Sequence, residues 1–175
     1  MARITIDTTT PVEIPSFDPP GPGEYMFEIK ESDIYVDEEN GRQSIRWELE
    51  VVEAESPENE KYVGKTISNF TTFAAEQTYI DRMTLDRRQK NPSAKDYDPR
   101  APLMGFLVDI GAATKDEAGR FSDTQNLFDA SGSFDLDVLN GHRFYATVVE
   151  RPGKGANAGK TFTNIKRIRP LTAEA

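Results

Sequence analysis

Two alternating apolar patterns, separated by a turn signal, constrain the fold more than any other feature of the chain. In residues 23–30 the bulkiest apolar side chains fall on every second position, and residues 45–51 repeat this spacing with Ile, Trp, Leu and Val. A period of two is typical of a strand that buries one face. Between the two runs lies Asn40-Gly41, a dipeptide that favours the tight turns of β-hairpins. The sequence therefore predicts an antiparallel hairpin with Trp47 in the core.

The strand pattern continues for one more segment and then changes period. Residues 65–73, rich in Thr, Ile and Phe, are predicted to form a third strand. Residues 74–90 have apolar side chains at helical spacing, and a second, short helix is predicted to begin at Pro102. Residues 143–151 and 160–169 are the predicted fourth and fifth strands, joined by the loop PGKGANAG.

Three strands, a helical insert and two strands are the element order of an OB-fold, a five-stranded Greek-key barrel. We therefore expect a mainly β fold with a helical insert: a five-stranded OB-fold-like barrel with its helices between strands 3 and 4, in residues 74–141. Element order does not fix strand pairing, so an α+β sandwich with the same order stays open. Residues 1–22, with five prolines and four threonines, are predicted to be a flexible arm. The domain is expected over residues 23–170, followed by a short tail, residues 171–175.

The sequence has few residues or motifs that are typical of an enzyme active site. The chain has no cysteine, which excludes disulfides, thiolate nucleophiles and Cys-ligated metals, and His142 is its only histidine. The GANAGKT segment departs from the glycine spacing of a phosphate-binding loop and leads into a strand pattern instead of a helix. The candidate acid pairs lie in turns or at helix starts, where acids are common for local reasons. They are Asp135 with Asp137, Asp96 with Asp98, and Asp37-Glu38-Glu39. We expect no enzyme, no cofactor and no metal.

The N-terminal stretch lacks an apolar segment of signal-peptide length, and no long apolar run follows it. We therefore expect a cytoplasmic protein that is not bound to a membrane. The sequence does not fix its oligomeric state.

Positive charge is concentrated near the end of the chain. Residues 143–169 hold seven basic side chains and one acid, a sum of +6, whereas the chain as a whole carries −9 and the other residues therefore −15. Basic side chains interleaved with aromatics favour a groove for single-stranded nucleic acid. The alternative interpretation is a solvated hairpin whose charges protect an exposed edge from aggregation. Both interpretations fit this segment.

Phase along the strands selects the candidate binding residues. Phe162 shares its strand face with Lys160 and Lys166, and Tyr145 shares its face with Arg143 and Arg151, so both rings are candidates for stacking on bases. The candidate nucleic-acid-binding residues are Arg46, Lys65, Arg143, Tyr145, Arg151, Lys154, Lys160, Phe162, Lys166 and Arg167.

A short internal likeness links two of these candidates. Residues 63–70 read VGKTISNF and residues 158–165 read AGKTFTNI, each at the start of a predicted strand. One interpretation is that Lys65 and Lys160 enter a common groove. The other is convergent strand-start chemistry, with Gly for the turn and Thr and aromatic or β-branched residues for the pleat.

The chain resembles the phage-encoded single-stranded DNA-binding proteins of the OB-fold type. The resemblance covers residues 23–170 and is carried by the PGPGEYMFEIKES opening, the YVGKT strand start, the PLMGFLVDIGAA segment, and the closing LNGHRFYATVVE and KTFTNIKRIRP. It implies sequence-independent binding of single-stranded DNA in phage replication or recombination, in the host cytoplasm, with replication or recombination proteins as further partners. Cellular counterparts end in a strongly acidic tail, whereas PLTAEA has a single Glu, so the resemblance does not extend to recruitment through a tail.

A second function class stays open. In this alternative the protein is a non-enzymatic virion, assembly or adaptor component whose basic hairpin docks an acidic protein surface. The net charge of −9 favours the alternative but does not exclude a nucleic-acid groove, because charges beyond about 8 Å are screened at physiological salt.

Overall fold

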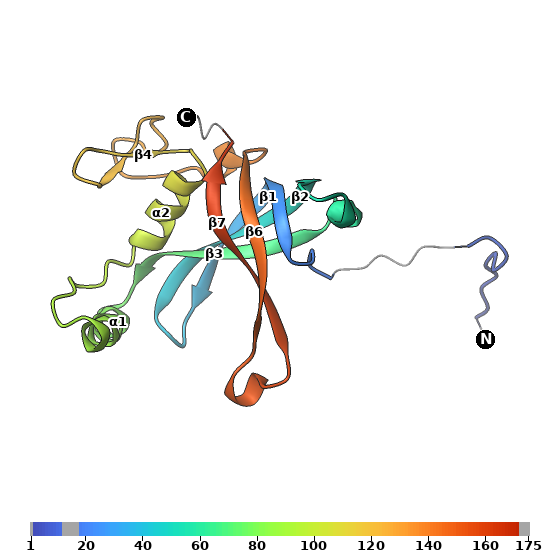
Figure 1. Ribbon diagram of the computed structural model, residues 1–175, viewed down its shortest axis with the longest axis horizontal. Helices are drawn as coiled ribbons and strands as arrows, with labels where there is room; N and C mark the ends of the chain where they lie inside the picture. The colour runs from blue at the N-terminus through green and yellow to red at the C-terminus, as the bar shows by residue number, and fades with distance from the viewer. Residues whose placement is uncertain (1, 12–17, 172–175) are drawn as a thin grey trace.

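The computed structural model describes residues 2–11 and 18–171. Its main element is a five-stranded antiparallel sheet in these residues (Figure 1). The strand order is β3-β2-β1-β6-β7. The strands are β1 (Gly23–Asp37), β2 (Arg42–Ala54), β3 (Thr66–Ala75), β6 (Arg143–Pro152) and β7 (Thr161–Pro170). The fourth of these strands returns by a long connection to pair with the first, which is the Greek-key arrangement.

The mainly β fold with helices between the third and fourth sheet strands is confirmed, but the sheet is not closed into a barrel. The two edge strands, β3 and β7, approach each other without pairing by hydrogen bonds in the described part of the chain. The helix α2 (Ala101–Asp109) contacts both of these edge strands.

The insert contains a small strand pair in addition to helices. Helix α1 (Gln77–Lys90) starts three residues later than predicted, because residues 74 and 75 still belong to β3. Two strands of two residues each, β4 (Thr114–Lys115) and β5 (Phe121–Ser122), form a small hairpin that is too short to produce a readable alternation in the sequence.

The described residues also include three short 3-10 helices. They are η1 (Pro57–Tyr62), η2 (Leu136–Leu139) and η3 (Gly155–Asn157). Among the described residues, no helix is long and apolar enough to cross a membrane.

The core lies between the sheet and α2. Trp47 is fully buried, as predicted, and its ring centroid lies 5.0 Å from that of Phe106 on α2. The indole N–H of Trp47 donates to Thr71 Oγ1 at 2.8 Å, so its one polar atom is satisfied. On β1, Phe27 is likewise buried and stacks on Phe144 of β6 at 6.0 Å. The alternation in the sequence therefore identified the core face of the central strands.

The N-terminal arm has two parts in the structure. Residues 2–11 form neither helix nor strand, and Ile4 is 84% exposed. Pro20, by contrast, is buried, and the Gly21 carbonyl accepts a 2.7 Å hydrogen bond from the Tyr25 hydroxyl. The end of the arm is thus packed on the sheet. Residue 1, residues 12–17 and residues 172–175 of the predicted tail lie outside the described residues.

Candidate nucleic-acid interface

The β6–β7 hairpin projects beyond the sheet. The last pair that β6 forms with β1 is Gly23 with Val148, whereas β6 and β7 remain paired as far as Pro152 and Thr161. Residues 149–164 therefore form a two-stranded extension, which we call the distal ribbon. Figure 1 shows it as the orange and red hairpin that extends away from the rest of the molecule.

One face of this hairpin combines an aromatic ring with basic and amide side chains. Residues directly opposite each other in an antiparallel pair share a face, and Arg151 lies opposite Phe162, with Val149 opposite Asn164 on the same side. We call this surface the ribbon face; its residues are Thr147, Val149, Arg151, Phe162, Asn164 and Lys166. Between residues 149 and 164 the ribbon face has no carboxylate, because Glu150 points to the opposite side of the hairpin. At the base of this face, Thr147 donates to the Glu24 carboxylate of β1.

Contacts across the ribbon face position the Phe162 ring. The Arg151 guanidinium carbon lies 5.3 Å from the ring centroid, a cation–π distance. In the amide orientation that satisfies both of its ends, Asn164 accepts a 2.8 Å hydrogen bond from Arg151 Nε. The ring also lies close to Gly153, where an added Cβ would come within 2.9 Å of Phe162 Cε2. The half-buried ring is thus presented on the ribbon, away from the main core.

The sequence-based phase is confirmed for most of this surface. Phe162 and Lys166 share a face, and Arg151 joins them from β6. Lys160 is the correction: β7 begins at Thr161, so Lys160 belongs to the connecting loop, where its carbonyl accepts a 2.7 Å hydrogen bond from the Gly153 N–H. It lies at the tip of the ribbon instead of on its strand face.

Four predicted cations lie on or beside the ribbon without a carboxylate partner. In the part of the chain that the structure describes, no ion pair involves Lys154, Lys160, Lys166 or Arg167. All four residues are exposed. Their charges are therefore available to an external anion.

A β-bulge in β7 determines which side chains lie on the surface at the base of the hairpin. Tyr145 pairs with Arg169 and Thr147 with Lys166, so β7 has one residue more than β6 over this stretch. Arg167 adopts φ 51°, in the left-handed region. The bulge changes the phase of the strand, so that Ile168 packs against the core and Arg169 lies on the outer side with Tyr145.

Acids on β1 neutralise the basic side chains closest to the sheet. Glu28 accepts from Arg143 Nε at 3.1 Å, and Glu24 accepts from an Arg169 terminal nitrogen at 2.8 Å. Hydrogen bonds from Thr147 and Arg169 hold the pKa of the Glu24 carboxyl below its usual value, and hydrogen bonds from Arg143 and Lys30 do the same for Glu28. Arg143 is therefore on the predicted surface but already paired.

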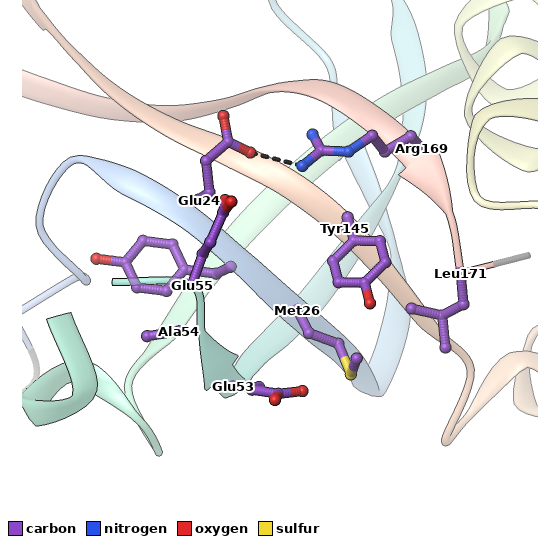
Figure 2. Close-up of a pocket in the computed structure, with 9 residues that line it drawn as sticks. Glu24, Met26, Glu53, Ala54, Glu55, Tyr145, Arg169 and Leu171 are labelled. Atoms are coloured by element: carbon purple, nitrogen blue, oxygen red, sulfur yellow. Dashed lines mark hydrogen bonds and ion pairs between the residues drawn. The ribbon is translucent and has the colours of Figure 1, made fainter. Parts of the chain in front are cut away.

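A pocket of about 470 Å³ lies beside Tyr145 (Figure 2). Its lining residues are Glu24, Tyr25, Met26, Glu53, Ala54, Glu55, Tyr145, Arg169 and Leu171. The Arg169 guanidinium carbon lies 5.5 Å from the Tyr145 ring centroid, so it covers part of the ring that was predicted to stack on a base. Arg169 was part of the basic segment but was missed as a site residue.

Arg46 and Lys65 lie away from the ribbon. Arg46 is on the outer side of β2, where it forms a 3.0 Å ion pair with Asp33 of β1. Lys65 precedes β3, and its carbonyl accepts from the Val51 N–H at 2.9 Å. Lys65 and Lys160 thus precede the two different edge strands of the sheet, and a groove shared by them stays a prediction.

An exposed aromatic pair next to Arg46 was also missed. Phe70 on β3 is 52% exposed, Tyr35 on β1 is 49% exposed, and their ring centroids lie 5.5 Å apart. Tyr35 reaches the outer side because a bulge at Lys30 changes the phase of β1 after Ile29. The only signal in the sequence is the break in alternation at that point.

The histidine and the paired acids that the sequence offered as catalytic candidates have local structural roles. His142 Nε2 donates to the Ile110 carbonyl at 2.6 Å, which ties the start of β6 to the end of α2. Asp135 caps η2 by accepting from the Asp137 N–H, and Asp98 pairs with Arg100. Within residues 2–11 and 18–171, no three acidic or histidine side chains cluster closely enough to hold a metal ion.

Comparison of the chain with protein-family models finds no match, and comparison with curated proteins finds none with significant similarity. Function is therefore inferred from the ribbon and the charges around it.

Proposed function

We propose that the protein is a non-enzymatic binding protein for single-stranded DNA with little sequence preference, acting in phage DNA replication or recombination. The observation that supports this proposal most directly is the distal part of the ribbon face, where a half-buried aromatic ring lies among a cation and an amide and residues 149–164 add no carboxylate. Bases of any kind stack on an aromatic ring, and cations track the phosphates, so such a surface binds without reading sequence.

The fold supports the same proposal. A Greek-key sheet of five strands, with its helices inserted before the fourth, is the OB-fold arrangement. We propose that this protein is an OB-fold opened between β3 and β7. In OB-folds that bind oligonucleotides, the loop between the last two strands is one of the binding elements, and the distal ribbon occupies that position here.

The outer side of β1 and β2 supports the second candidate, an assembly or adaptor protein. Glu31 lies directly opposite Glu48, and Asp33 pairs with Arg46, so this surface is acidic and repels a phosphate backbone. A basic ribbon next to an acidic surface also suits self-association or docking to a protein of mixed charge.

Titration of a fluorescent oligonucleotide at several salt concentrations separates the two candidates. With about three to six phosphates neutralised, log affinity should fall with log salt with a slope of about −2 to −4, from about −0.7 per phosphate. Duplex of the same length should bind much more weakly, because its bases are already stacked and cannot stack on the Phe162 ring. The basic helix α1 does not change this expectation, because Arg88 is paired with Asp96 and Arg82 donates to Asn40. A flat salt response, or equal affinity for duplex, would refute the DNA-binding proposal.

Charge-matched variants locate the site. The triple variant Lys154→Gln, Lys160→Gln, Lys166→Gln should reduce the magnitude of the salt slope by up to about 2. The control variant Lys61→Gln, Lys90→Gln, Lys95→Gln removes the same charge from η1, α1 and the loop after α1, and should leave the slope unchanged. Equal effects of both variants would show a general charge effect instead of a ribbon site.

A further inference from the structure

The carboxylate of Glu24 occupies an anion site at the base of the hairpin. One oxygen accepts from the Thr147 hydroxyl at 2.6 Å, and the other accepts from Arg169 at 2.8 Å. Thr147 lies directly opposite Glu24 in the β1–β6 register, and the bulge of β7 brings Arg169 to the same side. Figure 2 shows the ion pair above the pocket that contains Tyr145.

An arginine together with a hydroxyl is a donor set that suits a phosphate as well as a carboxylate. Arg binds both anions through the same planar donors, and hydroxyl side chains are common phosphate contacts in DNA complexes. The Glu24 side chain is 32% exposed and its Arg169 partner is 41% exposed. A DNA backbone approaching along β6 can therefore reach these donors once the carboxylate moves away.

Given DNA binding as proposed above, we propose that Glu24 is an internal competitor of a DNA phosphate. In the free protein its carboxylate occupies the site formed by Arg169 and Thr147. In the complex a phosphate replaces it between Arg169 and Thr147, beside the Tyr145 ring. Glu24 thereby limits affinity at the base of the hairpin and leaves the distal ribbon as the first point of contact.

The strength of the Glu24–Arg169 ion pair is compatible with its replacement by a phosphate. Partly exposed ion pairs change equilibria by at most about fivefold, which a phosphate in a polyanionic strand overcomes. Glu28 makes the same kind of contact with Arg143, two pleat repeats further along β1. Glu24 and Glu28 thus both lie along β1 at the base of the basic hairpin.

The test compares Glu24→Gln with Glu55→Gln. The first variant keeps an oxygen for Thr147 but removes the competing charge; the second removes the same charge from the same pocket, where Glu55 has no ion pair with a described residue. Both are titrated with an oligothymidylate of about 20 nucleotides, longer than the footprint of about 4–16 nucleotides of an OB-fold. Glu24→Gln should bind about two- to fivefold more tightly than Glu55→Gln, with a salt slope steeper by about 0.7.

A double variant shows whether the gain passes through Arg169. Adding Arg169→Gln to Glu24→Gln should remove the gain in affinity and the extra salt slope. If Glu24→Gln binds no more tightly than Glu55→Gln, or if the gain survives loss of Arg169, the competitor role is refuted while DNA binding stands. If the wild-type protein does not bind the oligonucleotide at all, the proposed function fails and the competitor role fails with it. Thermal melts verify folding, and Glu24→Ala provides a second variant with the same expected direction.

Discussion

Replacement of Phe162 by Ala tests the proposed function most directly, because the structure separates the contribution of this ring to folding from its contribution to binding. The ring is half-buried on the ribbon, where Arg151 lies over it and Gly153 is close to its edge. An exposed cation–π contact contributes about 0.5–1 kcal/mol, and full burial of a Phe side chain about 1.5–3 kcal/mol. Partial burial therefore predicts a loss of about 1–2 kcal/mol of unfolding free energy. In a protein of this size that lowers the melting temperature by about 2–8 °C.

The loss of binding free energy should be at least as large as the loss of unfolding free energy. Removing one aromatic ring that stacks on a base costs about 1–3 kcal/mol, which is an increase in Kd of about 5- to 150-fold. Fluorescence anisotropy with a labelled oligonucleotide measures the first quantity, and a thermal melt of the same preparation measures the second.

Phe121→Ala is the matched control. Phe121 is also half-buried, with an edge-on contact to Phe128 at 6.1 Å, but it lies on β5 in the insert. Phe121 also packs against the main core, so this change should lower the melting temperature at least as much, and it should leave Kd unchanged. If Phe162→Ala melts far below this control and still binds normally, the ring is a structural element and the stacking role is refuted.

Three further variants test the details of the structure. Arg167→Gly should leave the unfolding free energy unchanged or raise it by up to about 1 kcal/mol, because Gly adopts the left-handed φ of 51° without strain; an oligonucleotide titration should also show a salt slope smaller by about 0.7. Thr71→Val should cost about 1–3 kcal/mol in chemical denaturation, because it leaves the buried Trp47 N–H without its acceptor; an unchanged stability would contradict that hydrogen bond. Glu48→Gln should raise the melting temperature at about pH 7, because the adjacent Glu31 raises the folded-state pKa of Glu48 above 4.5 and the ionised form disfavours the folded state. This gain should vanish as the pH falls below about 4.5, where Glu48 is protonated in both states.

The core was predictable because burial is encoded residue by residue. A strand with one buried face must alternate, so Trp47 and Phe27 could be assigned to the core from spacing alone. Bulges break this relation. The extra residues at Lys30 and Arg167 each move the following side chains to the other face of the strand. In the sequence, the only sign of such a bulge is a break in the alternation, such as the spacing of three between Ile165 and Ile168.

The candidate site was only half predictable for a similar reason. Phase placed Phe162 and Lys166 on one face without knowledge of the partner strand. Whether a cation is free depends instead on the neighbouring strand, and Arg143 and Arg46 each turned out to lie beside an acid of β1. The partners of these arginines are 115 and 13 residues away in the sequence, a relation that only the strand register provides.

The geometry of the hairpin explains how a chain of net charge −9 can present a positive surface. The acids of β1 neutralise the base of the hairpin, but β1 ends its pairing with β6 at Val148, and β6 continues to Pro152. At about 3.3 Å per residue, these last four residues carry the tip about 13 Å beyond the acidic strand. That distance exceeds the screening length of about 8 Å at physiological salt, so the potential at Lys154 and Lys160 is set by the ribbon itself. Lower salt lengthens the reach of the β1 acids, and it should therefore strengthen binding less than the number of ribbon cations alone would indicate.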